Sequence, residues 1–142
     1  MSDTQPATEI KAVIVLSPRL TIGPAANRAA VLSTGLVAHA PEIIGQNPST
    51  KDKISLLGFT KVPIPILTSR PDQSLVELAD EGKKKNLITI VFLSRAQGMR
   101  SYDEYLKSVS ETNYAELDVD AVAFYGTKKA VNSLTGNLPA LR

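Results

Sequence analysis

The chain has 142 residues, of which 43% are hydrophobic and 21% are charged, and it contains no cysteine and a single histidine. This length suits one compact domain, while the missing cysteines exclude disulfides, thiolate catalysis and zinc–thiolate sites, and one histidine argues against a histidine-rich metal site. The formal net charge of +2 is far from the strongly basic balance of most nucleic-acid-binding modules.

The first nine residues are small and polar, without an apolar core or an arginine-rich pattern, and are interpreted as a disordered tail rather than a targeting signal. No window of the chain approaches the roughly 18 to 20 apolar residues that a membrane span requires. We therefore expect a cytoplasmic protein without membrane association, in which residues 10–142 form a single domain.

The first part of this domain predicts a strand followed by a helix. Residues 10–16 (IKAVIVL) are apolar and β-branched with little alternation, as in a strand that is buried on both faces. Pro24 suits the first position of a helix, because the N–H that it lacks would have no partner there. Close approach to the sheet would explain Gly35 inside this helix. The apolar stripe of the helix has spacings of three and four and consists of Ala29, Leu32, Leu36 and Ala40.

The middle of the chain is interrupted by proline and glycine. Residues 41–61 predict a long excursion, with a hairpin and an edge strand as alternatives. Residues 62–67 (VPIPIL) predict the second strand, at the sheet edge or paired on one side only, because its prolines cannot donate to a β-ladder. A helix follows from Asp72 or Ser74, since Ser74 and Glu77 have the spacing of a capping box.

The last third of the chain predicts two more strands and two more helices. Residues 87–93 (LITIVFL) are an unbroken apolar run, which indicates a strand at the centre of the sheet. A capping box opens a helix over 101–112, residues 119–125 (VDAVAFY) form the fourth strand, and Thr127 caps a final helix that ends at Gly136. This alternation predicts an α/β fold, a three-layer α/β/α sandwich with a mixed, mostly parallel sheet of about four strands.

Four separate segments share features with one protein family. They are Leu20 to Asn27, the Pro-Ile-Pro-Ile run at 63–66, Ala96 with Gln97, and Lys129 to Val131 with Leu134 to Gly136. Together they resemble a family of small proteins of unknown function whose fold is similar to peptidyl-tRNA hydrolase II. The resemblance covers about residues 10–142 and implies a three-layer domain with a mixed sheet, and a homodimer.

The resemblance does not imply hydrolase activity. The hydrolases carry a lysine in the segment that opens the first helix, and this chain has Ala26 at or near that position. They also carry an aspartate in an Asp-Ala-Gly loop after a central strand, where the nearest equivalent here is the run Ser94, Arg95, Ala96 and Gln97.

A hydroxyl closely followed by a cation occurs at every predicted junction from strand to helix. The pairs are Ser17 with Arg19, Ser69 with Arg70, Ser94 with Arg95, and Thr127 with Lys128. The carboxyl ends of parallel strands meet at one edge of a sheet, where ligands bind and helix N-termini attract anions. The pattern predicts an anion site formed by Ser17, Arg19, Gly23, Asn27, Ser94, Arg95 and Gln97.

The same pattern also has an ordinary structural interpretation. Serine and threonine are common helix caps, a cation in a turn is usually solvated, and a mixed sheet would send at least one junction to the opposite edge. His39 suits the dipole of a helix end. Asp118 and Asp120 are interpreted as solvated turn residues, and Tyr102 and Tyr105 as packing residues.

Three functional hypotheses follow, and whether any reaction is catalysed stays open. The first is a binding or enzymatic module for a small anionic, aminoacyl or peptidyl ligand at the exits of the first, third and fourth strands. The second is a diverged peptidyl-tRNA esterase, with tRNA as a partner. The third is a non-catalytic homodimeric interaction protein that uses the prolines of 62–67 or the 41–61 excursion. No cofactor or metal is expected, because the segment 23–27 lacks the glycine pattern of nucleotide-binding loops.

Overall fold

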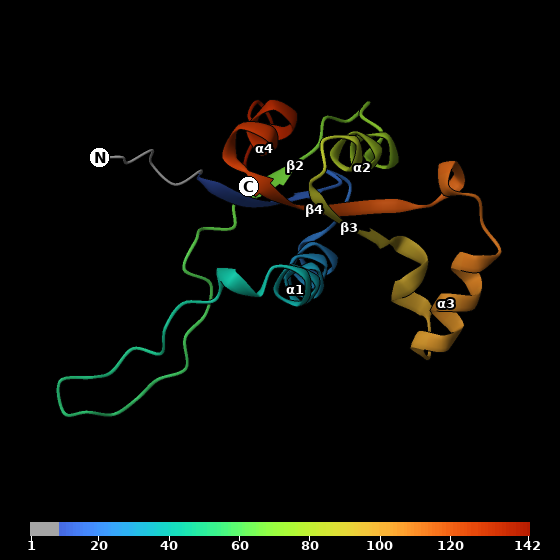
Figure 1. The fold of residues 1–142 in the computed structure, drawn as a ribbon. Coiled ribbons are helices and arrows are strands. Elements are labelled where there is room, and N and C mark those ends of the chain that lie inside the picture. The colour runs from blue at the N-terminus through green and yellow to red at the C-terminus, as the bar shows by residue number, and fades with distance from the viewer. Residues whose placement is uncertain (1–8) are drawn as a thin grey trace.

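Over the residues that the structure describes, the chain folds into an α/β structure with a four-stranded mixed sheet and four α-helices (Figure 1). The computed structural model describes residues 9–142, so positions 1–8 of the predicted tail lie outside it. The elements in chain order are β1 (Ile10–Leu16), α1 (Ile22–His39), η1 (Pro41–Ile43), β2 (Ile66–Thr68), α2 (Leu75–Lys84), β3 (Ile88–Leu93), η2 (Ser94–Gly98), α3 (Tyr102–Ser110), η3 (Tyr114–Glu116), β4 (Val119–Thr127) and α4 (Lys128–Thr135).

The strand order is β2-β1-β4-β3, in which β1 is parallel to β2, and β4 is antiparallel to β1 and to β3. Three strands therefore point the same way and β4 runs against them. The register pairs Leu16 with Ala121 and Ile10 with Thr127. As a result, β4 begins at the edge where β1 and β3 end, and β4 itself ends at the opposite edge.

The prediction that residues 87–93 form a central strand is wrong. β3 lies at the edge of the sheet, whereas β1 and β4 occupy the centre. β3 is nevertheless apolar except for Thr89, because both of its faces are covered. Ile90 lies in the cluster formed with α1, and Val91 lies in the cluster formed with α2. An unbroken apolar run thus indicates two covered faces and does not require a strand on each side.

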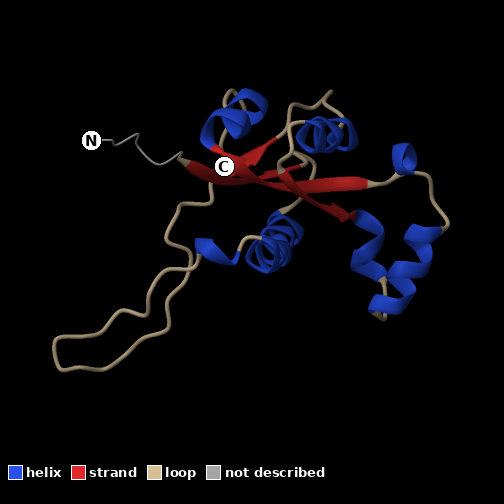
Figure 2. Cartoon of the chain, viewed as in Figure 1, coloured by secondary structure: helices blue, strands red, loops and turns tan. Residues whose placement is uncertain are grey.

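Helices cover both faces of the sheet (Figure 2). On one face, Ile14 packs in a cluster with Leu32 and Leu36 of α1, as the predicted stripe requires. On the other face, buried residues of β1 and β4 pack with α2 and α4. A Cβ added at Gly35 would lie 2.9 Å from Ile90 Cδ1, which confirms the predicted close approach of α1 to the sheet.

The helix starts follow the capping signals of the sequence, with one difference. The hydroxyls of Ser74, Ser101 and Thr127 each accept a hydrogen bond from a backbone N–H three residues on. α1 begins at Ile22, two residues before the predicted start, because a proline anywhere in the first turn removes no helical hydrogen bond. In residues 9–142, no helix is long and apolar enough to cross a membrane.

The proline-rich segment 62–67 forms a shorter strand than predicted, which begins after its prolines and lies at the sheet edge, as expected. β2 spans Ile66–Thr68 and pairs with β1, and the Pro65 carbonyl accepts a hydrogen bond from the Ile14 N–H. On its other side, Leu67 forms an isolated bridge with Ala140. The C-terminal segment therefore covers part of this edge.

Residues 44–60 form a hairpin that projects from the rest of the molecule, and we call this segment the arm (Figure 1). Antiparallel bridges join Ile44 to Thr60 and Ser49 to Ser55. The Gly45 N–H donates to the Phe59 carbonyl at 2.8 Å. Of the two alternatives for the 41–61 excursion, the hairpin is the one observed.

Candidate functional site

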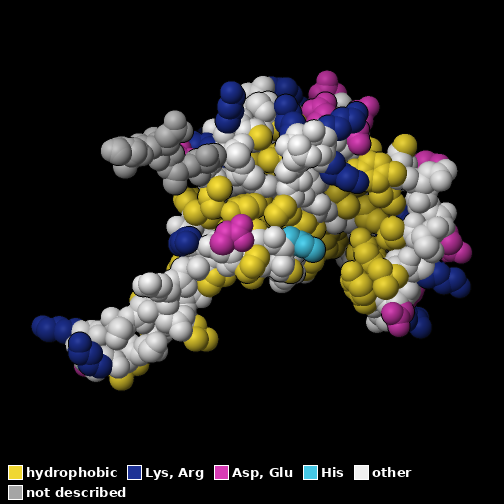
Figure 3. Space-filling view, in the orientation of Figure 1, with side chains coloured by type: hydrophobic (Ala, Val, Ile, Leu, Met, Phe, Trp, Pro, Cys, Tyr) yellow, Lys and Arg dark blue, Asp and Glu magenta, His cyan; other side chains and the backbone are white. Residues whose placement is uncertain are grey.

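A groove of about 870 Å³ lies between α1, β3 and α3. Its surface is mainly apolar, with Val31 from α1, Ile90 and Phe92 from β3, and Tyr102 and Tyr105 from α3 among the lining residues. Figure 3 shows hydrophobic side chains at the hollow between the sheet and α3. Near the start of α1 the lining becomes polar, where it includes Asn27, Arg28 and Gln97.

Arg28 is the buried charge at this polar end of the groove. Its side chain is 3% exposed, and its Nη2 lies 2.8 Å from Oδ2 of Asp120, with a second bond from Nε to Oδ1 at 3.3 Å. Nη1 donates to the Gln97 Oε1 at 2.7 Å, and the guanidinium carbon lies 4.3 Å from the centre of the Phe92 ring. A carboxylate, an amide and an aromatic ring thus compensate for the burial of this cation.

The sequence analysis missed Arg28, although the sequence carries a signal for it. The buried face of α1 consists of Ala25, Arg28, Leu32 and Leu36, with spacings of three and four residues. An arginine on an apolar stripe must find a buried partner, because an unpaired charge in the core is costly. The sequence could not identify that partner, since Asp120 lies 92 positions further along the chain.

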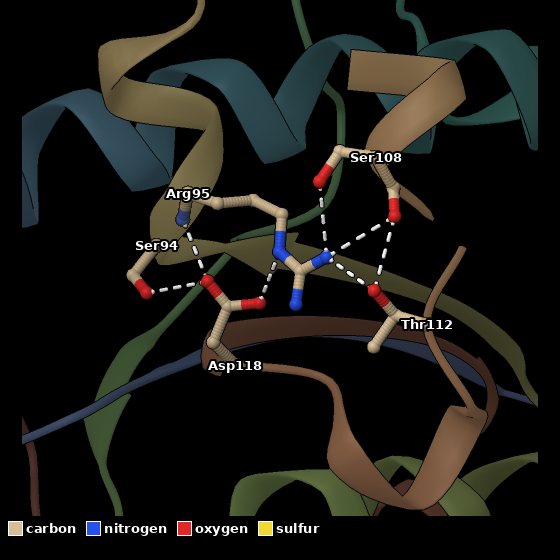
Figure 4. A network of polar contacts seen from close by, with 5 residues as sticks. All are labelled: Ser94, Arg95, Ser108, Thr112 and Asp118. Atoms are coloured by element: carbon tan, nitrogen blue, oxygen red, sulfur yellow. Dashed lines mark hydrogen bonds and ion pairs between the residues drawn. The ribbon is translucent and has the colours of Figure 1, made fainter. Parts of the chain in front are cut away.

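A second network connects η2, α3 and the segment that enters β4 (Figure 4). Asp118 accepts hydrogen bonds from the Ser94 hydroxyl and the Arg95 backbone N–H, both at 2.7 Å, and from the Arg95 guanidinium at 2.6 Å. Arg95 Nη1 also donates to the Thr112 hydroxyl at 2.7 Å and to the Ser108 hydroxyl at 3.1 Å. Arg95 therefore holds α3 against the end of the sheet.

The environment of Asp118 lowers its pKa. Burial of the carboxyl acts in the opposite direction, but the hydrogen bonds from Ser94 and from the Arg95 backbone and guanidinium outweigh it and hold the pKa below the ordinary value. The interpretation of Asp118 and Asp120 as solvated turn residues is therefore wrong. Both are ion-paired, because antiparallel β4 brings its first residues to the edge where β1 and β3 end.

The seven residues predicted to bind an anion lie in three places. Gly23, Asn27 and Gln97 line the groove. Ser94 and Arg95 belong to the Asp118 network. Ser17 and Arg19 line a second cavity of about 280 Å³, together with Ser69, Arg70 and the start of α2.

The remaining junction, Thr127 with Lys128, lies at the opposite edge of the sheet because β4 is antiparallel. The predicted exit of the fourth strand therefore does not join the exits of the first and third strands. Lys128 instead forms an ion pair with Glu9 at 3.2 Å.

The other residues considered from the sequence have simple placements. His39 is exposed in the last turn of α1. Tyr102 is 72% exposed, so its interpretation as a packing residue is wrong, whereas Tyr105 is half-buried and its ring centre lies 5.7 Å from that of Tyr102. Among the described residues, no group of three or more His, Asp or Glu side chains is arranged to hold a metal ion.

Comparison with known proteins identifies one family and a structural relative. Residues 10–142 match the family described as "Protein of unknown function (DUF2000)". A solved structure of Atu0240, a protein of unknown function from Agrobacterium tumefaciens C58, has the same fold with a TM-score of 0.84 and 17% sequence identity, over 94% of this chain and 98% of that chain. Comparison with curated proteins gives no match.

Proposed function

This chain belongs to the DUF2000 family of proteins of unknown function, and we propose that its groove binds a mostly apolar ligand that carries an amide or a carboxylate. An acyl-amino acid or a peptidyl segment has this chemistry. The observation that supports the proposal is the combination, in one groove, of apolar side chains along α1, β3 and α3 with the polar cluster of Asn27, Arg28 and Gln97. Ligand pockets commonly combine an apolar lining with a few fixed polar groups.

The buried polar groups of the site favour an amide or a carboxylate over a small inorganic anion. Arg28, the buried arginine of the lining, is already paired with Asp120, whereas Arg100, which also lines the groove, is exposed. Because the Gln97 oxygen accepts from Arg28, the amide N–H groups of Gln97 are left to donate to a ligand oxygen. Asn27 supplies a second amide in the same lining.

We propose that the resemblance to peptidyl-tRNA hydrolase II concerns the fold and not the activity. The helices on both faces of the mixed sheet support a three-layer arrangement similar to peptidyl-tRNA hydrolase II. Ala26 and the Ser94 to Gln97 segment depart from the hydrolase pattern, and Arg95 has a structural role in its network with Asp118. The proposal is therefore a binding function, without a hydrolytic step.

A thermal-shift series at fixed protein concentration tests the ligand class. N-acetyl amino acids with large apolar side chains, and short apolar peptides, should raise the melting temperature by mass action, whereas inorganic phosphate should not. Asn27→Ala and Gln97→Ala should remove most of the shift, because each deletes an amide that lines the groove.

Two control variants locate the site. Asn137→Ala changes an exposed asparagine that follows α4. Because α4 packs on the face of the sheet opposite the groove, this variant should leave the shift in melting temperature unchanged. Arg19→Ala changes the second cavity and should also have no effect. A shift that responds to Arg19→Ala and not to Asn27→Ala would place the ligand in the second cavity and contradict the proposal, as would no shift with any of these compounds.

A further inference from the structure

The arm exposes a row of large apolar side chains. Leu57 is 86% exposed, Phe59 is 79% exposed and Ile54 is 57% exposed. Single exposed hydrophobic residues are common on protein surfaces, but a contiguous set usually marks an interaction site. These residues lie within six positions of one another on a projecting hairpin (Figure 1).

The arm has a defined hairpin structure. Thr50 donates to Asp52 at 2.6 Å and accepts from the Ile54 N–H at 2.9 Å, and the Asn47 side chain accepts from the Gly58 N–H at 2.8 Å. A Cβ at Gly58 would lie 2.6 Å from the carbonyl oxygens of Gly45 and Gln46, so the two sides of the hairpin approach as only glycine allows. A lone two-stranded hairpin is marginally stable in water at best. A surface that packs against the arm would therefore stabilise it.

We propose that the arm binds in the groove of a second copy of this chain, and that two copies exchange arms in this way. The inference rests on the proposed function, because it names the partner of the same groove. β3 pairs with β4 on one side and borders the groove, so an extended segment can be added beside it. Val31 and Tyr102, both exposed, supply apolar surface for Leu57 and Phe59.

Charge also favours this pairing. Lys51 and Lys53 are exposed near the turn of the arm, and Asp52 between them bonds to Thr50. The first turn of α3, beside the groove, carries Asp103 and Glu104. α3 also carries Lys107, and Arg100 lines the groove, so the attraction for the basic turn of the arm is confined to the first turn of α3, where these two carboxylates lie.

The position of the arm excludes its own groove as the binding site. In Figure 1 the arm leaves the molecule on one side of α1, and α3 lies on the other side. One copy therefore cannot fill its own groove, whereas a twofold axis gives two identical arm–groove contacts and closes the assembly.

The first test is the oligomeric state by sedimentation equilibrium of the full chain. The protein should be a dimer, and Phe59→Asp or Val31→Asp should each raise the dimer dissociation constant by at least about 30-fold, as the loss of a central interface residue does. Leu141→Ser is the matched control, because Leu141 is 43% exposed but lies at the C-terminal segment beside β2. Its dissociation constant should stay unchanged.

Mixing the two variants identifies the surfaces in contact. A Phe59→Asp copy keeps a native groove and a Val31→Asp copy keeps a native arm, so an equimolar mixture should form heterodimers through one intact contact. Failure of the mixture to associate would overturn the arm–groove contact, as would a monomeric wild-type protein or a dimer that tolerates Phe59→Asp.

Cross-linking gives an independent measurement. The chain has no cysteine, so Leu57→Cys combined with Tyr102→Cys introduces the only two thiols. Oxidation should give a covalent dimer, whereas either single variant should not, and equal products from all three would contradict the proposal. Because the arm and a small ligand would compete for one groove, the ligand screen is repeated on Phe59→Asp, whose groove is native and free of an arm. If ligands give no thermal shift with that variant but the dimer tests succeed, the small-ligand proposal alone is wrong. If ligands bind and the tests fail, the arm proposal alone is wrong.

Discussion

The pairing of Arg28 with Asp120 sets the polar end of the groove. The Arg28 side chain is 3% exposed and that of Asp120 is 15% exposed, so each charge depends on the other. A buried ion pair contributes little compared with an apolar pair of the same volume, but the loss of one partner leaves an uncompensated charge.

The substitution Arg28→Met should therefore destabilise the protein by about 3–5 kcal/mol. The double variant Arg28→Met with Asp120→Leu should recover most of this loss, because no charge is then left unpaired. Urea denaturation of both variants measures the difference. A double variant as unstable as Arg28→Met alone would show that the ion pair is not the source of the effect.

Asp118 makes the stability depend on pH. Its folded-state pKa lies below the ordinary value of 3.8, so the carboxylate stabilises the folded state above pH 3.8, and this contribution is lost as the pH falls through the folded-state pKa. Asp118→Asn should cost about 1.5–3 kcal/mol at pH 7, the range for a hydrogen bond to a charged group.

The difference in unfolding free energy between Asp118→Asn and wild type should shrink below pH 3.8. Asp80→Asn is the matched control, because Asp80 forms an exposed ion pair with Lys84 one helical turn away. Such pairs contribute at most about 0.5 kcal/mol. Denaturant unfolding at several pH values tests this prediction, and a constant difference across the pH range would contradict it.

Gly82 allows helix α2 to pack closely against the sheet. A glycine inside a helix normally costs about 1 kcal/mol relative to alanine. A Cβ at Gly82, however, would lie 2.8 Å from Cδ1 of Phe124, whose ring is fully buried. The backbone of α2 thus approaches the sheet more closely than an alanine would allow.

Gly82→Ala should therefore destabilise the protein by about 1–3 kcal/mol, as overpacking of a core does. Gly23→Ala is the control in α1, because a Cβ there has no atom within 4 Å, and it should be neutral or stabilising. Thermal unfolding of the two variants compares them. A stabilising Gly82→Ala would show that α2 can shift on the sheet at little cost.

α3 is attached in a different way from the other helices. It contains no buried residue, and Arg95 connects it to the entry of β4 through Ser108 and Thr112. One side of the groove is thus held by polar contacts rather than by a hydrophobic core. Arg95 follows β3, a position that also suits ligand binding, but its role here is to hold α3.

At the scale of the whole molecule, the direction of β4 decides the site. Because β4 is antiparallel, its first residues lie beside the exits of β1 and β3, where Asp118 and Asp120 neutralise two arginines. The groove then lies between α1 and α3 over an edge strand, and the arm projects on the other side of α1. In the proposed dimer, the arm of one copy and the groove of the other are brought together.

Most of the helices and strands follow from local signals in the sequence. Apolar runs predicted β1, β3 and β4, proline predicted the edge position of β2, and capping residues marked the starts of α2, α3 and α4. These signals depend on neighbouring residues in the chain. Strand direction, sheet order and the partners of Arg28 and Arg95 do not follow from such local signals. They depend on contacts between residues far apart in the chain, such as Arg28 with Asp120, and local spacing carries no information about which distant residues will meet.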